Sequence, residues 1–253
     1  LSTDSVAVTA GTASAADAAD AATAAEPASA AASPGLDFEI DGRLRGQPLT
    51  AEPIRHHVVA FDFGMKKNMA RMLVHRGCKV TVVPASTTAE QVRALAPDGV
   101  LLSNGPGDPS TVPHVVDAVR SLLGAVPVFG ICMGHQILGQ ALGASTYKTP
   151  YGHRGGNQPV ATDVGANVAA GVASRVLITS QNHGFAVKPE GLDAPARATE
   201  TNLSDGTNEG LDAPEKWCFS VQYHPEAAPG PHDAGIHFDR FLQMMDKFAR
   251  RAS

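Results

Sequence analysis

Residues 126–142 read VPVFGICMGHQILGQAL, and this stretch indicates the fold class. Its first six residues, 126–131, are an apolar run that predicts a buried strand, and a helix is expected over 134–142. Between them, GICMG at residues 130–134 has the G-x-S-x-G form of a nucleophile elbow, with cysteine in place of serine. Such a sharp turn lifts one side chain clear of the sheet, and flanking glycines tolerate the crowding. The start of the helix then favours the thiolate of Cys132, which is the nucleophilic form of a cysteine.

Strands and helices alternate along the chain ahead of this elbow. Apolar runs predict buried strands over residues 57–63, 78–83 and 99–102. Helical spacing predicts helices over residues 66–75, 88–95 and 112–123. This alternation indicates an α/β fold, a doubly wound and mostly parallel sheet with helices on both faces. Because ligands of such sheets lie at the carboxyl ends of the strands, we expect the chemistry just after Phe63, Leu102 and Ile131.

The amino-terminal part differs in composition from the rest of the 253 residues. Of residues 1–35, 15 are alanine and none is aromatic, Lys or Arg, so the segment is expected to be a low-complexity tail or linker. Residues 36–55 are interpreted as a transition segment and residues 56–253 as the catalytic domain. Because the chain begins at Leu1 rather than Met, we interpret it as a fragment or a processed product.

Charge and cysteine content narrow the function. With 20 basic and 25 acidic residues the net charge is −5, and no basic cluster points to nucleic acid or an anionic membrane. No apolar run approaches the ~18 residues that a membrane span needs. Three cysteines without a C-x-x-C pair argue against a disulfide scaffold or a metal site such as a zinc site, and they favour a cytoplasmic, reducing compartment.

A thiolate nucleophile needs a base and an orienting partner, and one segment offers both. His224 ends the strand predicted over 217–223 and is followed by Pro225 and Glu226. Residues two apart on an extended segment point to the same side, so His224 and Glu226 can be adjacent. The sequence therefore predicts that Cys132, His224 and Glu226 act together.

The loop after Leu102 reads SNGPGDP over residues 103–109. Two glycines and two prolines make a stiff turn in which the backbone can approach a ligand closely. Its N–H groups are candidates for an oxyanion hole, and a plain strand-to-helix turn is the alternative.

The GICMGHQ elbow and the HPE segment together resemble class I, triad-type glutamine amidotransferase domains. Five further stretches resemble the small, glutamine-hydrolysing subunit of carbamoyl phosphate synthetase. They are FDFGMKKN (61–68), SNGPGDP (103–109), GHRGGNQPV (152–160), SQNHGFAV (180–187) and HPEAAPGPHD (224–233). The resemblance covers about residues 56–248 and implies a flavodoxin-like fold.

The resemblance implies roles for particular residues. Cys132 matches the nucleophile, His224 the base and Glu226 its partner. Glutamine contacts are implied at Gly105, Gly107, Met133, Gln136, Asn182, Gly184 and Phe185, with the Gly107 and Met133 amides as the oxyanion hole. The family's separate N-terminal domain, which contributes to the glutamine pocket and to docking, is expected to be absent from this chain.

The resemblance also implies a partner. Ammonia from L-glutamine would pass to a large synthetase subunit, which makes carbamoyl phosphate from bicarbonate and ATP for pyrimidines and arginine. ATP and Mg are expected on that subunit, and no cofactor or metal on this chain. Two other classes of function stay open: another amidotransferase or cysteine hydrolase, such as a γ-glutamyl hydrolase, and a non-catalytic module that stabilises a synthetase.

The apolar stripe of the helix predicted over 233–250 is expected to pack on the home sheet.

Overall fold

The structure is a computed structural model that describes residues 36–37, 43–44, 47–48, 54–162 and 175–251. The tail predicted for residues 1–35 lies outside the described residues, as does most of the transition segment predicted for 36–55. Within that segment, three two-residue strands are described: β1 (Leu36–Asp37), β2 (Arg43–Leu44) and β3 (Gln47–Pro48). β2 pairs with β3, and β1 pairs with an edge strand of the main sheet.

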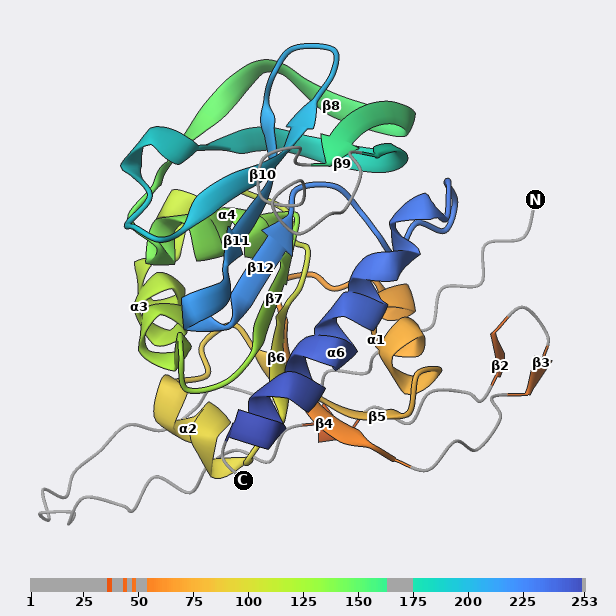
Figure 1. Cartoon of the computed structure of the whole chain (residues 1–253), viewed down its shortest axis with the longest axis vertical. Helices are drawn as coiled ribbons and strands as arrows, with labels where there is room; N and C mark the ends of the chain where they lie inside the picture. The colour runs from red at the N-terminus through yellow and green to blue at the C-terminus, as the bar shows by residue number, and fades with distance from the viewer. Residues whose placement is uncertain (1–35, 38–42, 45–46, 49–53, 163–174, 252–253) are drawn as a thin grey trace, which may run out of the picture. The chain divides into compact units, whose positions relative to one another are not determined.

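Five parallel strands form the centre of the main sheet (Figure 1). They are β4 (His56–Asp62), β5 (Cys78–Pro84), β6 (Gly99–Leu102), β7 (Val128–Ile131) and β12 (Cys218–Val221). Their order is β5-β4-β6-β7-β12, and each pairs with its neighbour in parallel. β6, β7 and β12 are buried at every position, as expected for strands with both faces covered. The predicted α/β fold with a parallel central sheet is confirmed.

Helices cover both faces of these strands. The helices are α1 (Lys67–Val74), α2 (Ala89–Ala94), α3 (Pro113–Leu122), α4 (Met133–Ala141) and α6 (Ile236–Arg251). Buried side chains of α1 and α6 pack in one apolar cluster with Phe129 of β7, and those of α2, α3 and α4 pack in a second cluster. Phe238 and Phe241 of α6 lie against Phe129 with ring centroids 5.8 and 5.7 Å apart, so the predicted packing of this helix on the home sheet is confirmed.

A capping box sets the start of α2, and short 3-10 turns link other elements. The Thr88 hydroxyl accepts from the Gln91 backbone, and the Gln91 side chain accepts from the Thr88 backbone, which forms a capping box at the start of α2. Short 3-10 turns precede or join other elements: η1 (Pro109–Thr111), η2 (Pro189–Gly191), η3 (Pro214–Lys216) and η4 (Asp233–Gly235).

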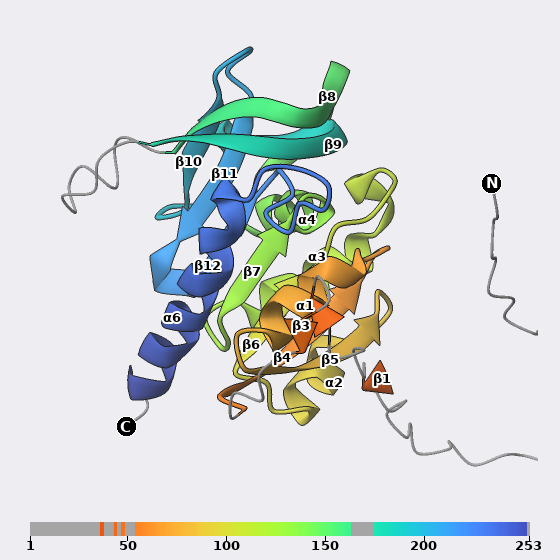
Figure 2. The same cartoon turned by 90° about the vertical axis from the view of Figure 1, so that its right-hand side faces the viewer.

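Four strands that the sequence pattern did not identify extend the sheet beyond β12. They are β8 (Ser145–Thr162), β9 (Val176–Lys188), β10 (Arg197–Asn202) and β11 (Asn208–Ala213), paired antiparallel in the order β12-β11-β10-β8-β9. Figure 2 shows β8 and β9 as long, curved strands at the end of the sheet away from β5. Their register shifts between Lys148 and His153, within a glycine-containing, polar stretch that has no clear alternation. Among the described residues, none of the helices has the length and apolar content needed to cross a bilayer.

Candidate active site

Cys132 stands in the sharp turn between β7 and α4. Its backbone has φ 55° and ψ −102°, a conformation that costs free energy in a residue with a Cβ. A Cβ on Gly134 would lie 2.1 Å from the Leu102 carbonyl oxygen, and one on Gly130 would lie 2.6 Å from the Gly134 carbonyl oxygen. Only glycine fits these two positions, and the turn therefore holds Cys132 at the carboxyl end of β7, where the sequence placed it.

His224 and Glu226 meet in the segment that follows β12. The His224 N–H donates to the Ser180 carbonyl at 2.8 Å, which ties this segment to β9. His224 Nδ1 lies 2.7 Å from Glu226 Oε1, and both side chains are buried. The predicted adjacency of these two side chains is confirmed.

The surroundings of His224 favour its charged form. Burial by itself lowers the pKa of the imidazole, but hydrogen bonds to Cys132 and Glu226 and the charges of those groups outweigh burial and raise the pKa to about 9. Because Nδ1 is bonded to Glu226, Nε2 is the ring nitrogen that remains for Cys132. The three residues thus form a chain from sulfur to imidazole to carboxylate.

Two residues next to Glu226 were not identified from the sequence. Lys66, at the start of α1, places its Nζ 3.1 Å from Glu226 Oε1, and Asn68 donates its side-chain amide to the Glu226 carbonyl oxygen. Glu226 Oε2 is buried and has no hydrogen-bond partner among the described residues. Lys66 and Asn68 both belong to the FDFGMKKN stretch at residues 61–68. The position of this stretch after the first parallel strand was the only sequence signal that could have indicated their role.

A cavity of about 390 Å³ opens beside Cys132. Its lining residues are Gly105, Pro106, Gly107, Asp108, Cys132, Gln136, Arg154, Asn182, His183, Gly184 and Phe185. Six of the seven predicted glutamine contacts are therefore brought together. Met133 is the exception, because its side chain is 5% exposed and packs in the apolar cluster of α2, α3 and α4. Its backbone N–H stands at the first position of α4, where a helix offers no internal partner.

The polar groups of the cavity have defined orientations. Gln136 Nε2 donates to the Phe185 carbonyl at 2.9 Å and to Gln222 Oε1 at 3.1 Å. Its two N–H groups are thereby used, and Gln136 Oε1 is left to accept a hydrogen bond from a ligand. A Cβ added to Gly184 would meet no atom within 4 Å, so Gly184 borders open space. The sequence did not identify Pro106, Asp108, Arg154 and His183 as lining residues.

The doubly wound sheet carries Cys132 at a strand-to-helix turn, with His224 and Glu226 next to it, an arrangement that suits a cysteine nucleophile of the triad type. Residues 59–244 match the family described as class-I glutamine amidotransferases. The chain belongs to this family.

Several curated relatives are about 50% identical to this chain over the aligned residues. The carbamoyl phosphate synthase small chain of Syntrophotalea carbinolica is 54% identical over 201 residues, which are 79% of this chain and 51% of that protein. The small chain of Escherichia coli K12 is 51% identical over 197 residues, 78% of this chain and 50% of that protein. The chloroplastic small chain of Oryza sativa is 51% identical over 189 residues, 75% of this chain and 41% of that protein. The chain thus spans about half the length of the curated relatives it matches.

Solved structures agree on the fold. A protein from Thermoplasma acidophilum that is described as a GMP synthase component superposes with a TM-score of 0.65 at 19% identity, covering 78% of this chain and 96% of that one. A glutamine amidotransferase from Thermotoga maritima superposes with a TM-score of 0.51 at 16% identity, covering 78% and 83%. At these identities the likeness concerns the fold alone.

Proposed function

We propose that this chain is the glutamine-hydrolysing component of a carbamoyl phosphate synthase. The observation that carries the proposal is the buried His224–Glu226 pair, 2.7 Å apart, next to Cys132 in the wall of a cavity of about 390 Å³. A cavity of this volume is at the lower end of small-ligand sites and suits an amino acid. Membership of the amidotransferase family and the names of the curated relatives support glutamine as the substrate.

The proposed reaction begins at Cys132. His224 takes the thiol proton, and the sulfur forms a bond to the side-chain amide carbon of glutamine. The N–H groups of Gly107 and Met133 would hold the oxyanion that develops on the amide oxygen. His224 then gives its proton to the leaving nitrogen, the C–N bond breaks, and ammonia and a γ-glutamyl thioester result. Water, which loses a proton to His224, attacks the thioester, and glutamate leaves as the protonated sulfur is restored.

The substrate's amino-acid end would bind at the cavity wall opposite Cys132. Gln136 Oε1 can accept from the substrate ammonium, since the Gln136 N–H groups are already engaged. Asn182, Gly184 and Phe185 line the same cavity, as does Gly105. These positions keep the side-chain amide of the substrate pointed toward the sulfur.

The partner in this proposal is a large synthetase subunit. It would take up the ammonia, bind ATP and Mg, and form carbamoyl phosphate with bicarbonate; this chain itself would need no cofactor. The name "small chain" that the relatives carry supports a two-subunit protein. We also propose that the protein works in the cytoplasm, which its three free cysteines support. In this proposal, neither nucleic acid nor a membrane is a partner.

The test is glutamate release from L-glutamine by the chain and by Cys132→Ala, each with and without a large synthetase subunit. Activity that is lost in Cys132→Ala and rises with the large subunit is the expected result. Equal release by both forms, or none even with the subunit, would contradict the proposal. A parallel assay with γ-glutamyl peptides separates a γ-glutamyl hydrolase, because only that class would prefer the peptide.

A further inference from the structure

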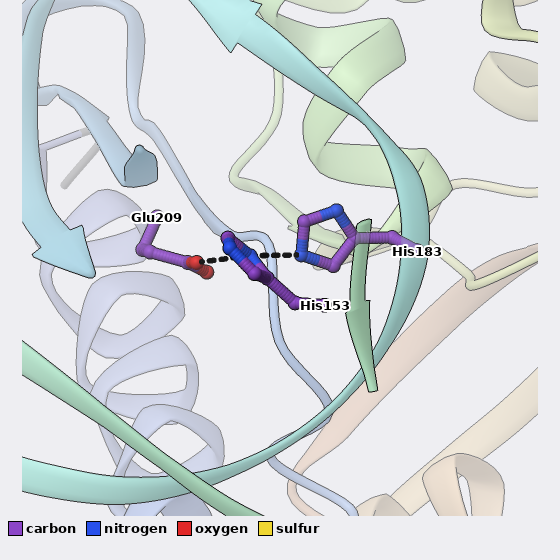
Figure 3. Close-up of side chains that lie close together, drawn as sticks. All are labelled: His153, His183 and Glu209. Carbon is purple, nitrogen blue, oxygen red and sulfur yellow. Dashed lines mark hydrogen bonds and ion pairs between the residues drawn. The ribbon is translucent and has the colours of Figure 1, made fainter. Parts of the chain in front are cut away.

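Three side chains with metal-binding atoms converge in the antiparallel part of the sheet. His153 of β8, His183 of β9 and Glu209 of β11 are all buried, and one ligand atom from each lies within 4.8 Å of the other two. Figure 3 shows His153 between Glu209 and His183. His153 Nδ1 lies 3.2 Å from His183 Nε2 and 3.3 Å from Glu209 Oε1. Atoms bound to one tetrahedral zinc ion at about 2.0–2.1 Å are about 3.3 Å apart, so both distances fit a shared ion.

The hydrogen bonds around His183 direct a lone pair into this cluster. His183 Nδ1 lies 2.8 Å from the Phe185 carbonyl oxygen, which can only accept, so Nδ1 carries the proton of the neutral ring. His183 Nε2 is then an acceptor, yet it lies 2.7 Å from Gln181 Oε1, which also accepts. The Gln181 amide nitrogen faces Thr179 Oγ1 at 3.2 Å, which favours this orientation of the amide. Two acceptors this close repel each other unless a positive charge lies beside them.

Glu209 contributes a buried carboxylate whose hydrogen bonding is incomplete. Its side chain is 0% exposed, and Oε1 is 3.2 Å from the Asn202 side-chain amide. Oε2 is also buried and has no hydrogen-bond partner among the described residues. A buried carboxylate oxygen without a partner is costly, and a cation at the cluster would satisfy it.

Both imidazoles also have the outer contacts that metal-binding histidines use. His153 Nε2, on the side away from the cluster, lies 2.9 Å from Asp205 Oδ2, and His183 Nδ1 faces the Phe185 carbonyl. Such a carboxylate or carbonyl fixes the ring orientation and makes the inner nitrogen a better ligand. The Asp205 side chain is 48% exposed and gives the cluster a route to solvent.

We propose that His153, His183 and Glu209 bind one divalent transition-metal ion of the zinc type. Two imidazoles and one carboxylate are a ligand set that suits zinc, and a water would complete four-coordination. The ion would join β8, β9 and β11, and β9 carries Asn182 and Gly184 of the cavity beside Cys132. This proposal does not depend on the substrate of that cavity.

The test is Zn²⁺ binding by competition with a chromophoric chelator, performed in a Cys132→Ala background so that the elbow thiol cannot bind the ion. One ion per chain is expected, and Co²⁺ in its place should give the visible absorption of a four-coordinate site. His153→Asn and Glu209→Gln should abolish stoichiometric binding. Asp205→Asn, which removes only an outer contact, should weaken binding by roughly 10–100-fold.

Matched controls are His114→Asn and Glu190→Gln, because both side chains are exposed and neither belongs to the cluster. They should bind as the parent does. Circular dichroism checks folding, and Asp205→Asn remains informative if a ligand variant does not fold. The proposal would be overturned if the parent shows no stoichiometric binding, or if the parent, Glu209→Gln and Asp205→Asn bind with equal affinity. The cluster would then hold a proton on His153 in place of a metal ion.

Discussion

Replacing Glu226 by glutamine isolates the charge of the carboxylate while keeping the size of the side chain. The structure holds the pKa of His224 at about 9 rather than 6.5, against the opposing effect of burial. That difference corresponds to roughly 3 kcal/mol of stabilisation of the imidazolium. Glu226 supplies part of this stabilisation beside Cys132, and the loss of a hydrogen bond to a charged group costs about 1.5–3 kcal/mol. We therefore expect kcat for glutamine hydrolysis to fall by roughly tenfold or more, since His224 is charged when the amide bond breaks.

The measurement has two readouts. Glutamate release gives kcat and KM, and an NMR titration of His224 gives its pKa, which should fall in Glu226→Gln even where activity is low. Glu215→Gln, an exposed carboxylate elsewhere, is the control. An unchanged kcat together with an unchanged His224 pKa would refute the reasoning, because the carboxylate could then not be stabilising the imidazolium.

Three further predictions follow from particular contacts. Gly184→Ala adds a methyl group to open space in the cavity and should raise KM for glutamine roughly tenfold with an unchanged melting temperature. Gly134→Ala instead places a methyl group 2.1 Å from a backbone oxygen and should destabilise the fold by about 1–3 kcal/mol or more. Thermal melts and steady-state kinetics separate the two effects. Lys66→Gln removes the cation from buried Glu226 and should lower kcat by up to about tenfold, and full activity would show that Lys66 has no positioning role. Burial raises the pKa of Glu200 from 4.5 to about 8, so the folded chain keeps a proton that the unfolded chain releases, and stability should fall as pH rises between these values. Denaturant titrations should show this slope reduced in Glu200→Gln, and an identical slope would contradict the prediction.

Local patterns determined the elbow, the His224–Glu226 pair and the parallel strands. A strand that turns into a helix between glycines needs only a few consecutive residues, and the contacts of Gly130 and Gly134 show why those residues must be glycine. His224 and Glu226 are two residues apart, so an extended backbone alone brings them to one side. The buried parallel strands are continuous apolar runs, which a sequence displays directly.

Only the tertiary structure identified the antiparallel strands and the contacts between side chains that are distant in the sequence. β8 contains glycines, prolines and a register shift, so its sequence has no alternation to identify a strand. Lys66 reaches Glu226, and His153 reaches His183 and Glu209, across long separations in the chain. Such meetings depend on which strands pair and in what register, a property of the whole sheet. A single sequence determines where its own backbone turns, and only the folded chain determines which distant side chains share a site.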